Sequence, residues 1–223
     1  SDMAKRQCII EVAQWKDHAL GPRHLLAVSD FRDLFAEDYI NADVRLSVGE
    51  QTLLFTDVVG STAFYESQGD PTAFVEIKKH FDEVFALIAK HNGAVIKTIG
   101  DAVMATFLEP LDAVQCSAAI HHAFGPARST CPIRLRISLN TGPCIAVRLN
   151  ATMDFFGGTV NVAAKLQALA ETWQVAMSAA TYHAAGVEEY LRSQDATLVP
   201  LQYVSKAMRG PVDVMRWDVF PSP

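Results

Sequence analysis

The sequence predicts an α+β fold, with a ferredoxin-like βαββαβ core and additional C-terminal strands and helices. Short β-branched segments and longer amphipathic segments alternate in the order strand, helix, strand, strand, helix, strand. The two middle strands, 94–99 and 102–107, are separated only by Gly100 and Asp101, which predicts a hairpin. We therefore expect an antiparallel sheet with helices on one face, in which the first and third strands are neighbours.

Local signals set the bounds of the first strand and the first helix. The strand is predicted at 51–58, and the helix at 71–91. Asp70 is the expected N-cap, Pro71 fits the first turn, and Gly93 closes the C-terminal end. Apolar residues at helical spacing predict the buried stripe of this helix, which comprises Phe74, Ile77, Phe81, Val84, Phe85 and Ile88.

The remaining segments complete the core and extend it. A second helix is predicted at 110–123 and a fourth strand at 133–139. We expect residues 1–45 to be a separate helical segment that leads in from an upstream region. Residues 46–223 are expected to form one folded domain. Further strands and helices are predicted, in chain order, at 144–149, 159–170, 174–177, from 178, 197–204 and 212–219.

Composition and charge exclude several classes of protein. Half of the residues are hydrophobic (50%) and 20% are charged, which is typical of a chain with a core and not of a disordered one. The net charge is −6, from 19 basic and 25 acidic side chains without a basic cluster, which argues against a general nucleic-acid surface. The four cysteines stand singly, which favours a reducing, cytoplasmic setting. No apolar run reaches the roughly 20 residues of a membrane span. A membrane anchor outside this sequence stays an open alternative.

Two aspartates and a glycine-containing turn predict a binding site. Asp57 lies near the end of an apolar strand and Asp101 at the tip of the hairpin. A carboxylate in such a place is costly to bury unless it is paired or binds a cation. The turn Gly60-Ser61-Thr62 offers backbone amides and hydroxyls that suit phosphate oxygens. Together they indicate magnesium and a nucleotide. The alternative is that Asp57 caps a turn and Asp101 lies in a solvated hairpin.

Three motifs carry a family resemblance. They are FTDVVGST at 55–62, KTIGDAVMATF at 97–107 and DFFGGTVNVAAKLQ at 154–167. In this order and at this spacing they resemble the catalytic domain of class III nucleotidyl cyclases, the adenylate and guanylate cyclases. The resemblance runs from about residue 51 to about residue 219, and it implies that 46–223 is a class III cyclase catalytic domain.

The resemblance also implies a metal-dependent reaction. Two Mg²⁺ or Mn²⁺ ions would be held by the carboxylates of Asp57 and Asp101, with the Val58 carbonyl as a further ligand. They would activate the ribose 3′-hydroxyl of a nucleoside triphosphate for attack on the α-phosphate while pyrophosphate leaves. Within this family we favour an adenylate cyclase, because of Lys97 and Asp154, with guanylate cyclase as the alternative.

Lys97 and Asp154 match the two positions that select the base in the resembled family. Adenine presents an acceptor ring nitrogen beside an amine donor, so a lysine and an aspartate can read it together. Guanylate cyclases tend to place a glutamate at the first position. The pair therefore favours ATP over GTP. The alternative for each residue alone is an exposed strand lysine at Lys97 and a loop acid at Asp154.

Asn161 and Lys165 lie one turn apart on the predicted helix that follows Gly157-Gly158, and so share a face. The resemblance implies that Asn161 orients the ribose and that Lys165 stabilises the transition-state charge, a position where the family has arginine. Lysine keeps the charge but loses the planar fork that grips two oxygens. A catalytically weak, nucleotide-binding regulatory domain is therefore a second alternative.

Arg136 and Lys206 match phosphate-binding cations of the family, although Arg134 shares a strand face with Arg136 and competes for that role. The resemblance implies a homodimer with two sites at its interface and an upstream sensor or regulatory domain as a further partner. Each site would draw Asp57, Asp101 and Arg136 from one subunit, and the other subunit would supply Lys97, Asp154, Asn161, Lys165 and Lys206.

Overall fold

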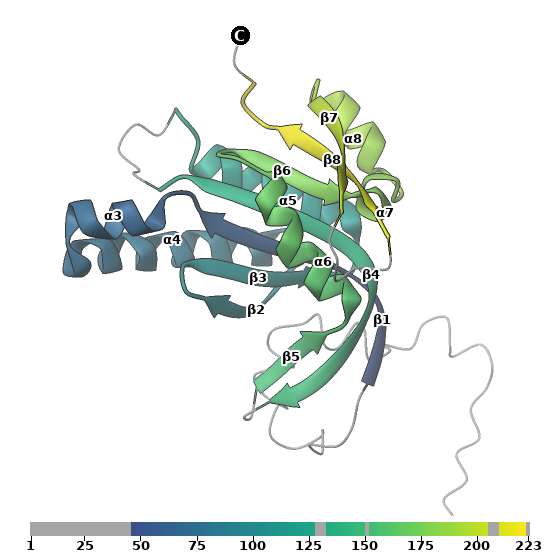
Figure 1. Cartoon of the computed structure of the whole chain (residues 1–223), viewed down its shortest axis with the longest axis horizontal. Helices are drawn as coiled ribbons and strands as arrows, with labels where there is room; N and C mark the ends of the chain where they lie inside the picture. Colours follow the sequence, from purple (N-terminus) through teal and green to yellow (C-terminus); the bar gives the residue numbers. More distant parts are fainter. Residues whose placement is uncertain (1–45, 128–132, 150–151, 205–209, 222–223) are drawn as a thin grey trace, which may run out of the picture.

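The computed structural model describes residues 46–127, 133–149, 152–204 and 210–221. The predicted lead-in at 1–45 and the predicted phosphate-binding Lys206 lie outside the described residues. Within the described ranges, eight strands form one sheet in the order β2-β3-β1-β4-β6-β8-β7, with β5 paired to β4 (Figure 1). The predicted α+β fold is confirmed.

The centre of the sheet is formed by the core strands that the sequence predicts. β1 (Leu46–Val58) lies between β3 (Ala102–Phe107) and β4 (Leu135–Leu149) and runs antiparallel to both. β2 (Ala94–Ile99) forms a hairpin with β3. The expected contact of the first and third strands is thus confirmed, and it brings the end of β1 beside the β2–β3 turn.

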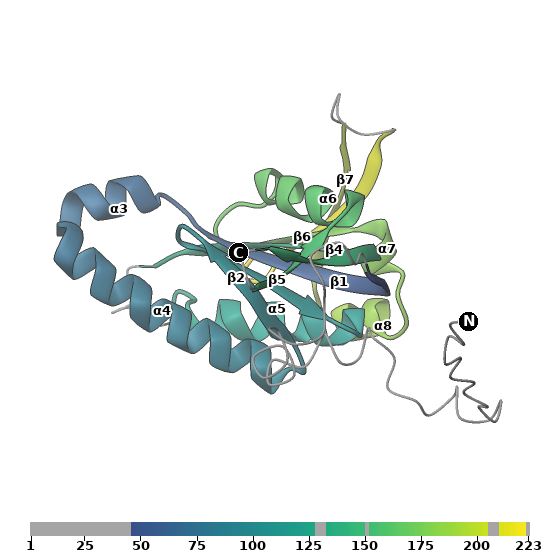
Figure 2. The same ribbon diagram turned by 90° about the horizontal axis from the view of Figure 1, so that it is seen from below.

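Helices cover both faces of the sheet, and the expectation of one covered face is wrong. α4 (Asp70–Lys90) and α5 (Pro110–Ala123) lie on one face, and α6 (Gly158–Leu166) lies on the other (Figure 2). Alternate residues of β1 divide accordingly: Leu54 joins the apolar cluster under α4 and α5, whereas Leu53 joins the cluster under α6. This second layer forms because the chain beyond the βαββαβ core folds back over the exposed face.

The sheet is also not purely antiparallel. β6 (Gln174–Ser178) pairs with β4 in parallel, with Ile137 opposite Val175. α6 and the short 3₁₀ turn Gln167–Leu169 make the crossover connection that a parallel pair requires. β8 (Val212–Asp218) and β7 (Thr197–Tyr203) complete the sheet beyond β6, close to their predicted ranges.

Several bounds differ from the predictions. β4 is one continuous strand across the two segments predicted at 133–139 and 144–149. β5 (Thr152–Phe156), α3 (Ser61–Gln68) and α8 (Val187–Ser193) were not predicted. The helix expected from residue 178 is present as α7 (Ala179–Tyr182), whose first turn is capped by the Ser178 hydroxyl. Among the described residues no helix is long and apolar enough to cross a membrane.

The predictions for α4 are partly confirmed, both at its N-terminal end and along its buried stripe. Its N-cap is Gly69 and not Asp70, although a proline does occupy the first turn. Ile77, Val84 and Ile88 are buried as predicted, but Phe74 is 67% exposed. The first turns of α4 extend, together with α3, past the end of the sheet (Figure 2), so none of the described strands covers an apolar side chain there.

Candidate active site

Asp57 is the penultimate residue of β1 and lies directly opposite Arg136 of β4. The Arg136 guanidinium contacts a single carboxylate oxygen with two nitrogens: Nε donates to Oδ2 at 2.7 Å, and Nη2 lies 2.5 Å from the same atom. The Asp57 side chain is 22% exposed and that of Arg136 is 34% exposed. Of the two arginines that the sequence left in competition, Arg136 is therefore the one that faces Asp57, and Arg134 is exposed.

Asp101 lies at the same end of the sheet. The β1–β3 register pairs Phe55 with Met104, and the Val103 amide donates to the Thr56 hydroxyl at 3.0 Å. Because the strands are antiparallel, this register carries the hairpin tip with Asp101 alongside the end of β1. The structure thus places the two predicted metal-binding aspartates at one end of two neighbouring strands.

The Asp101 carboxylate fits a cation site. Its Oδ2 atom is buried, and within the described part of the chain no donor lies within hydrogen-bonding distance of it. A buried carboxylate oxygen without a partner is costly, and a divalent cation would satisfy it. Among the described residues, no three His, Cys, Asp or Glu side chains lie together so that they could hold a metal ion. Further ligands would therefore be carbonyl and phosphate oxygens, which Mg²⁺ and Mn²⁺ accept readily.

The turn after β1 is shaped to receive an anion. Gly60 has a φ of +74°, in the left-handed region that glycine adopts without strain, and it is the N-cap of α3. A glycine cap has no side chain that could accept hydrogen bonds from the first helical amides. The first amides of α3, which the sequence predicts to bind phosphate, thus have no side-chain cap, and uncapped amides at a helix N-terminus can bind an anion.

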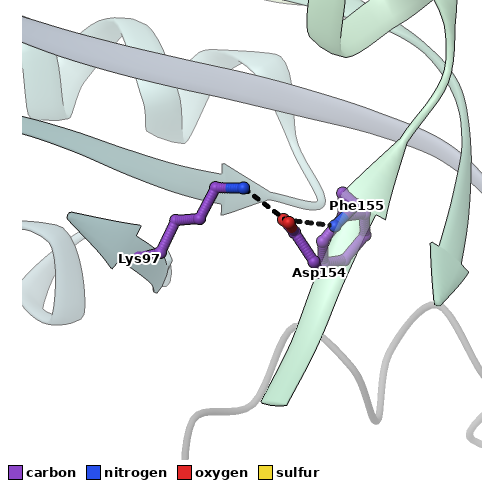
Figure 3. A network of polar contacts seen from close by, with 3 residues as sticks. All are labelled: Lys97, Asp154 and Phe155. Carbon is purple, nitrogen blue, oxygen red and sulfur yellow. Dashed lines mark hydrogen bonds and ion pairs between the residues drawn. The ribbon is translucent and has the colours of Figure 1, made fainter. Parts of the chain in front are cut away.

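Lys97 and Asp154, the predicted base-selecting pair, are in direct contact (Figure 3). Lys97 Nζ lies 2.5 Å from Asp154 Oδ2, and the Phe155 amide donates to Asp154 Oδ1 at 2.8 Å. The Lys97 side chain is 41% exposed and that of Asp154 only 10% exposed. The carboxylate is thus fixed at the sheet, whereas the lysine side chain is partly exposed.

A register shift in β2 places Lys97 on the correct face. Val95 pairs with Ala105, but Lys97 pairs with Met104, so one extra residue is inserted between them. Without that residue Lys97 would share the face of Val95, which packs against the cluster under α4 and α5. The shift instead turns Lys97 towards the face of Met104, where α6 and β5 lie.

Asn161 and Lys165 occupy α6 as predicted, with Asn161 exposed and Lys165 half-buried. Within the described ranges, neither side chain forms a hydrogen bond or an ion pair with Asp57 or Asp101. The predicted site residues of one chain therefore form three groups: the aspartates with Arg136, the Lys97–Asp154 pair, and the two polar residues of α6.

Two residues that support the site were not predicted. Gln167, which follows α6, donates from Nε2 to the Thr56 carbonyl at 3.1 Å. Thr56 also accepts from the Val103 amide through its hydroxyl, so this residue is held through both its carbonyl and its side chain directly before Asp57. Both residues lie within the quoted motifs, but the sequence assigns neither of them a role, because both contacts join segments far apart in the chain.

Comparison with known proteins decides the family. Residues 45–200 match the sequence model described as "Adenylate and Guanylate cyclase catalytic domain". The chain belongs to this family. The resemblance that the three motifs indicate is thereby confirmed, and the domain is a cyclase catalytic domain.

Its curated relatives include both kinds of cyclase. The domain is 30% identical over 172 residues to "Putative adenylate cyclase 3" of Rhizobium meliloti (strain 1021), an alignment that covers 74% of this chain and 28% of that protein. It is 31% identical over 148 residues to retinal guanylyl cyclase 1 of Rattus norvegicus, covering 59% of this chain and 13% of that protein. The chain thus spans less than a third of the length of these relatives, and the family does not decide between ATP and GTP.

Solved structures agree on the fold. The adenylyl cyclase CyaB from P. aeruginosa superposes with a TM-score of 0.66 at 20% identity, over 81% of this chain and 97% of that one. The guanylyl cyclase Cya2 gives a TM-score of 0.64 at 20% identity, over 79% and 94% of the two chains. The class III cyclase fold expected from the motifs is therefore confirmed.

Proposed function

We propose that this cyclase domain is an adenylate cyclase, which converts ATP to 3′,5′-cyclic AMP and pyrophosphate. The observation that carries the proposal is the Lys97–Asp154 contact of 2.5 Å, with one donor and one acceptor side by side. Adenine offers the complementary acceptor and donor on adjacent atoms. Guanine also has acceptors and donors on its edge, so the choice of adenine depends on the lysine at 97, where guanylate cyclases tend to have a glutamate.

Asp57, Asp101 and the Val58 carbonyl would hold the divalent ions, Mg²⁺ or Mn²⁺, two per site. Bound there, the ions supply acidification of the ribose 3′-hydroxyl and neutralisation of charge on the phosphates. The reaction forms a bond between the 3′ oxygen and the α-phosphorus and breaks the bond from that phosphorus to pyrophosphate, and the hydroxyl proton is released. Positioning and electrostatics supply most of the rate in such transfers.

The remaining predicted residues bind and orient the substrate. The turn of Gly60, Ser61 and Thr62 receives phosphate oxygens, and Arg136 and Lys206 add positive charge. Asn161 orients the ribose, and Lys165 stabilises the charge that develops as pyrophosphate leaves. These roles are consistent with a phosphate site at one end of β1 and a base site between β2 and β5.

Two copies of the domain would form each active site between them, as the resemblance implies. An exposed apolar surface beside the base site supports this arrangement. Ile99 is 51% exposed and follows Lys97 by two residues, and Phe156 is 46% exposed and follows Asp154 by two. Ile145, 38% exposed, lies opposite Phe156 across the β4–β5 pair. A second copy would bury these side chains and bring its aspartates to the Lys97–Asp154 pair. An upstream sensor or regulatory domain would then set the output.

The test is product formation by the purified chain from ATP and GTP, each with Mn²⁺ and with Mg²⁺, resolved by chromatography. The proposal expects cyclic AMP as the main product. Asp57→Asn serves as the inactive control. Cyclic GMP formed at an equal or higher rate would overturn the assignment to adenine, since the Lys97–Asp154 pair would not select the base.

Lys165 supports one second candidate, a nucleotide-binding regulatory domain with weak turnover. A lysine at this position cannot grip two phosphate oxygens as an arginine does. Lys165→Arg decides between the two: a rise in kcat of about tenfold or more would show that Lys165 limits the chemistry. An unchanged kcat in an active enzyme would show that lysine suffices.

A further inference from the structure

One carboxylate of the proposed metal site already has a partner within its own chain. Asp57 and Arg136 face each other across β1 and β4, and both contacting nitrogens of the guanidinium reach the same oxygen, Oδ2. Asp101 differs, because its buried Oδ2 has no donor within hydrogen-bonding distance in the described part of the chain. An incoming cation therefore meets a carboxylate oxygen that is already paired at Asp57, and a carboxylate oxygen without a donor at Asp101.

A divalent cation and a guanidinium compete for the same carboxylate oxygen. Both carry positive charge, so a cation that bound Asp57 Oδ2 beside an unmoved Arg136 would be repelled at short range. At Asp101 Oδ2 the described residues provide no competing donor. A cation that binds through Asp57 Oδ2 therefore requires the Arg136 side chain to move away.

We propose that Arg136 is a counter-ion gate for Asp57, which a triphosphate opens. The guanidinium holds Asp57 until the phosphates draw it away, and the carboxylate is then released to the divalent cation. This inference rests on the proposed function and adds to it: cation and triphosphate bind cooperatively, and Arg136 carries the coupling. The gate would limit cation binding to Asp57 until the substrate is present.

The local structure allows this exchange. The Arg136 side chain is 34% exposed and has a long flexible stem, so its head can move without opening the core. Arginine binds phosphate in the same forked geometry as carboxylate, and charge-assisted contacts of both kinds are strong. The register of β1 and β4 fixes both backbones, and the Thr56 carbonyl is held by Gln167. Only the side chain needs to change position.

The first test is Mn²⁺ binding alone, measured on the full chain by isothermal titration. Arg136→Met is expected to bind Mn²⁺ about fivefold more tightly than the unchanged chain, or better, at the lower end of typical coupling factors. Arg136→Lys should fall between the two. The matched control is Arg134→Met, which removes the same charge from an exposed position two residues away.

The reciprocal test uses inorganic tripolyphosphate without any divalent cation. Asp57→Asn frees Arg136, so tripolyphosphate should bind this variant more tightly than the unchanged chain, and Arg136→Met should abolish the gain. Asp213→Asn on β8 is the charge-matched control, because this aspartate is exposed and contacts Gln202 far along the sheet order. Thermal unfolding of each variant verifies that it is folded. If Arg136→Met does not fold, Arg136→Gln takes its place.

The outcomes separate the gate from the proposed function. Equal Mn²⁺ affinity of the Arg136→Met and Arg134→Met variants, or weaker binding by Arg136→Met, would overturn the gate while cyclic AMP formation could still stand. Mn²⁺ binding by no variant, together with no cyclic nucleotide formed from ATP or GTP, would overturn both. Tighter Mn²⁺ binding by Arg136→Met would support the gate even if the unchanged chain forms no cyclic nucleotide. That second result would count against the proposed enzyme activity.

Discussion

Replacing Lys97 by methionine tests the base site most sharply. The change removes the donor that lies 2.5 Å from Asp154 but keeps an unbranched apolar stem of similar length up to the Cε position. Asp154 retains its contact with the Phe155 amide, so its carboxylate stays in place. We expect ATP turnover to fall because the adenine ring nitrogen loses its hydrogen-bond donor.

The size of the effect follows from the exposure of the lysine. A hydrogen bond that involves a charged group contributes about 1.5–3 kcal/mol, which corresponds to a factor of roughly 10 to 150. Since the Lys97 side chain is 41% exposed, solvent screens the contact, and we take the lower end. The predicted loss in kcat/KM for ATP is thus about tenfold, and the loss for GTP should be smaller.

The assay is the ratio of kcat/KM for ATP to that for GTP, measured with Mn²⁺ for both substrates. Lys79→Met is the matched control, because Lys79 is an exposed lysine on α4 that pairs with Glu76 and lies outside the candidate site. The reasoning is refuted if Lys97→Met leaves the ratio unchanged, or if the control changes it equally.

Three further predictions address stability, assembly and support of the site. Burial lowers the pKa of His80 to about 4 and that of His121 to about 3, so the unfolded chain takes up protons first as the pH falls below 6.5. The free energy of unfolding should drop by on the order of 2 kcal/mol per imidazole between pH 7.5 and 5, measured by urea titration, and a pH-independent value would contradict this. Mixing the inactive Asp57→Ala chain with the weakened Lys97→Ala chain should raise cyclic AMP formation above that of either chain alone, through one complete site per heterodimer, whereas no rise above the Lys97→Ala level would argue against shared sites. Gln167→Leu should lower kcat several-fold with a small change in thermal midpoint, and wild-type kcat would show that its contact before Asp57 is dispensable.

The hairpin and the ends of the core strands could be predicted from local signals. The bounds of β2, β3 and α5 agree with the sequence because Gly100, Asp101 and Pro110 mark them directly. The approach of Asp57 and Asp101 then follows from topology, since β1 and β3 are neighbours. The motifs also indicated the Lys97–Asp154 pair, although this came through the family resemblance.

The rest depended on contacts between distant segments. The register shift in β2 that turns Lys97 towards β5 leaves no mark in an alternating apolar pattern. The long strand β4 carries Gly142 and Pro143, which suggest a break in the sequence, yet it continues because Gln51 and Glu50 of β1 pair with these two residues. The Arg136–Asp57 pair likewise required the observed register, because Arg134 shares the same alternation.

Asp101→Asn provides the most direct test of the central claim, that Asp57 and Asp101 hold divalent ions for cyclisation. The substitution keeps the shape of the side chain and removes the charge from a buried oxygen that lacks a donor. We predict that the rate of cyclic AMP formation with Mn²⁺ falls by about 100-fold or more, while the thermal midpoint stays equal or rises, because a costly buried charge is gone. Retained activity together with a lowered midpoint would contradict the account, since Asp101 would then serve the fold and not the metal.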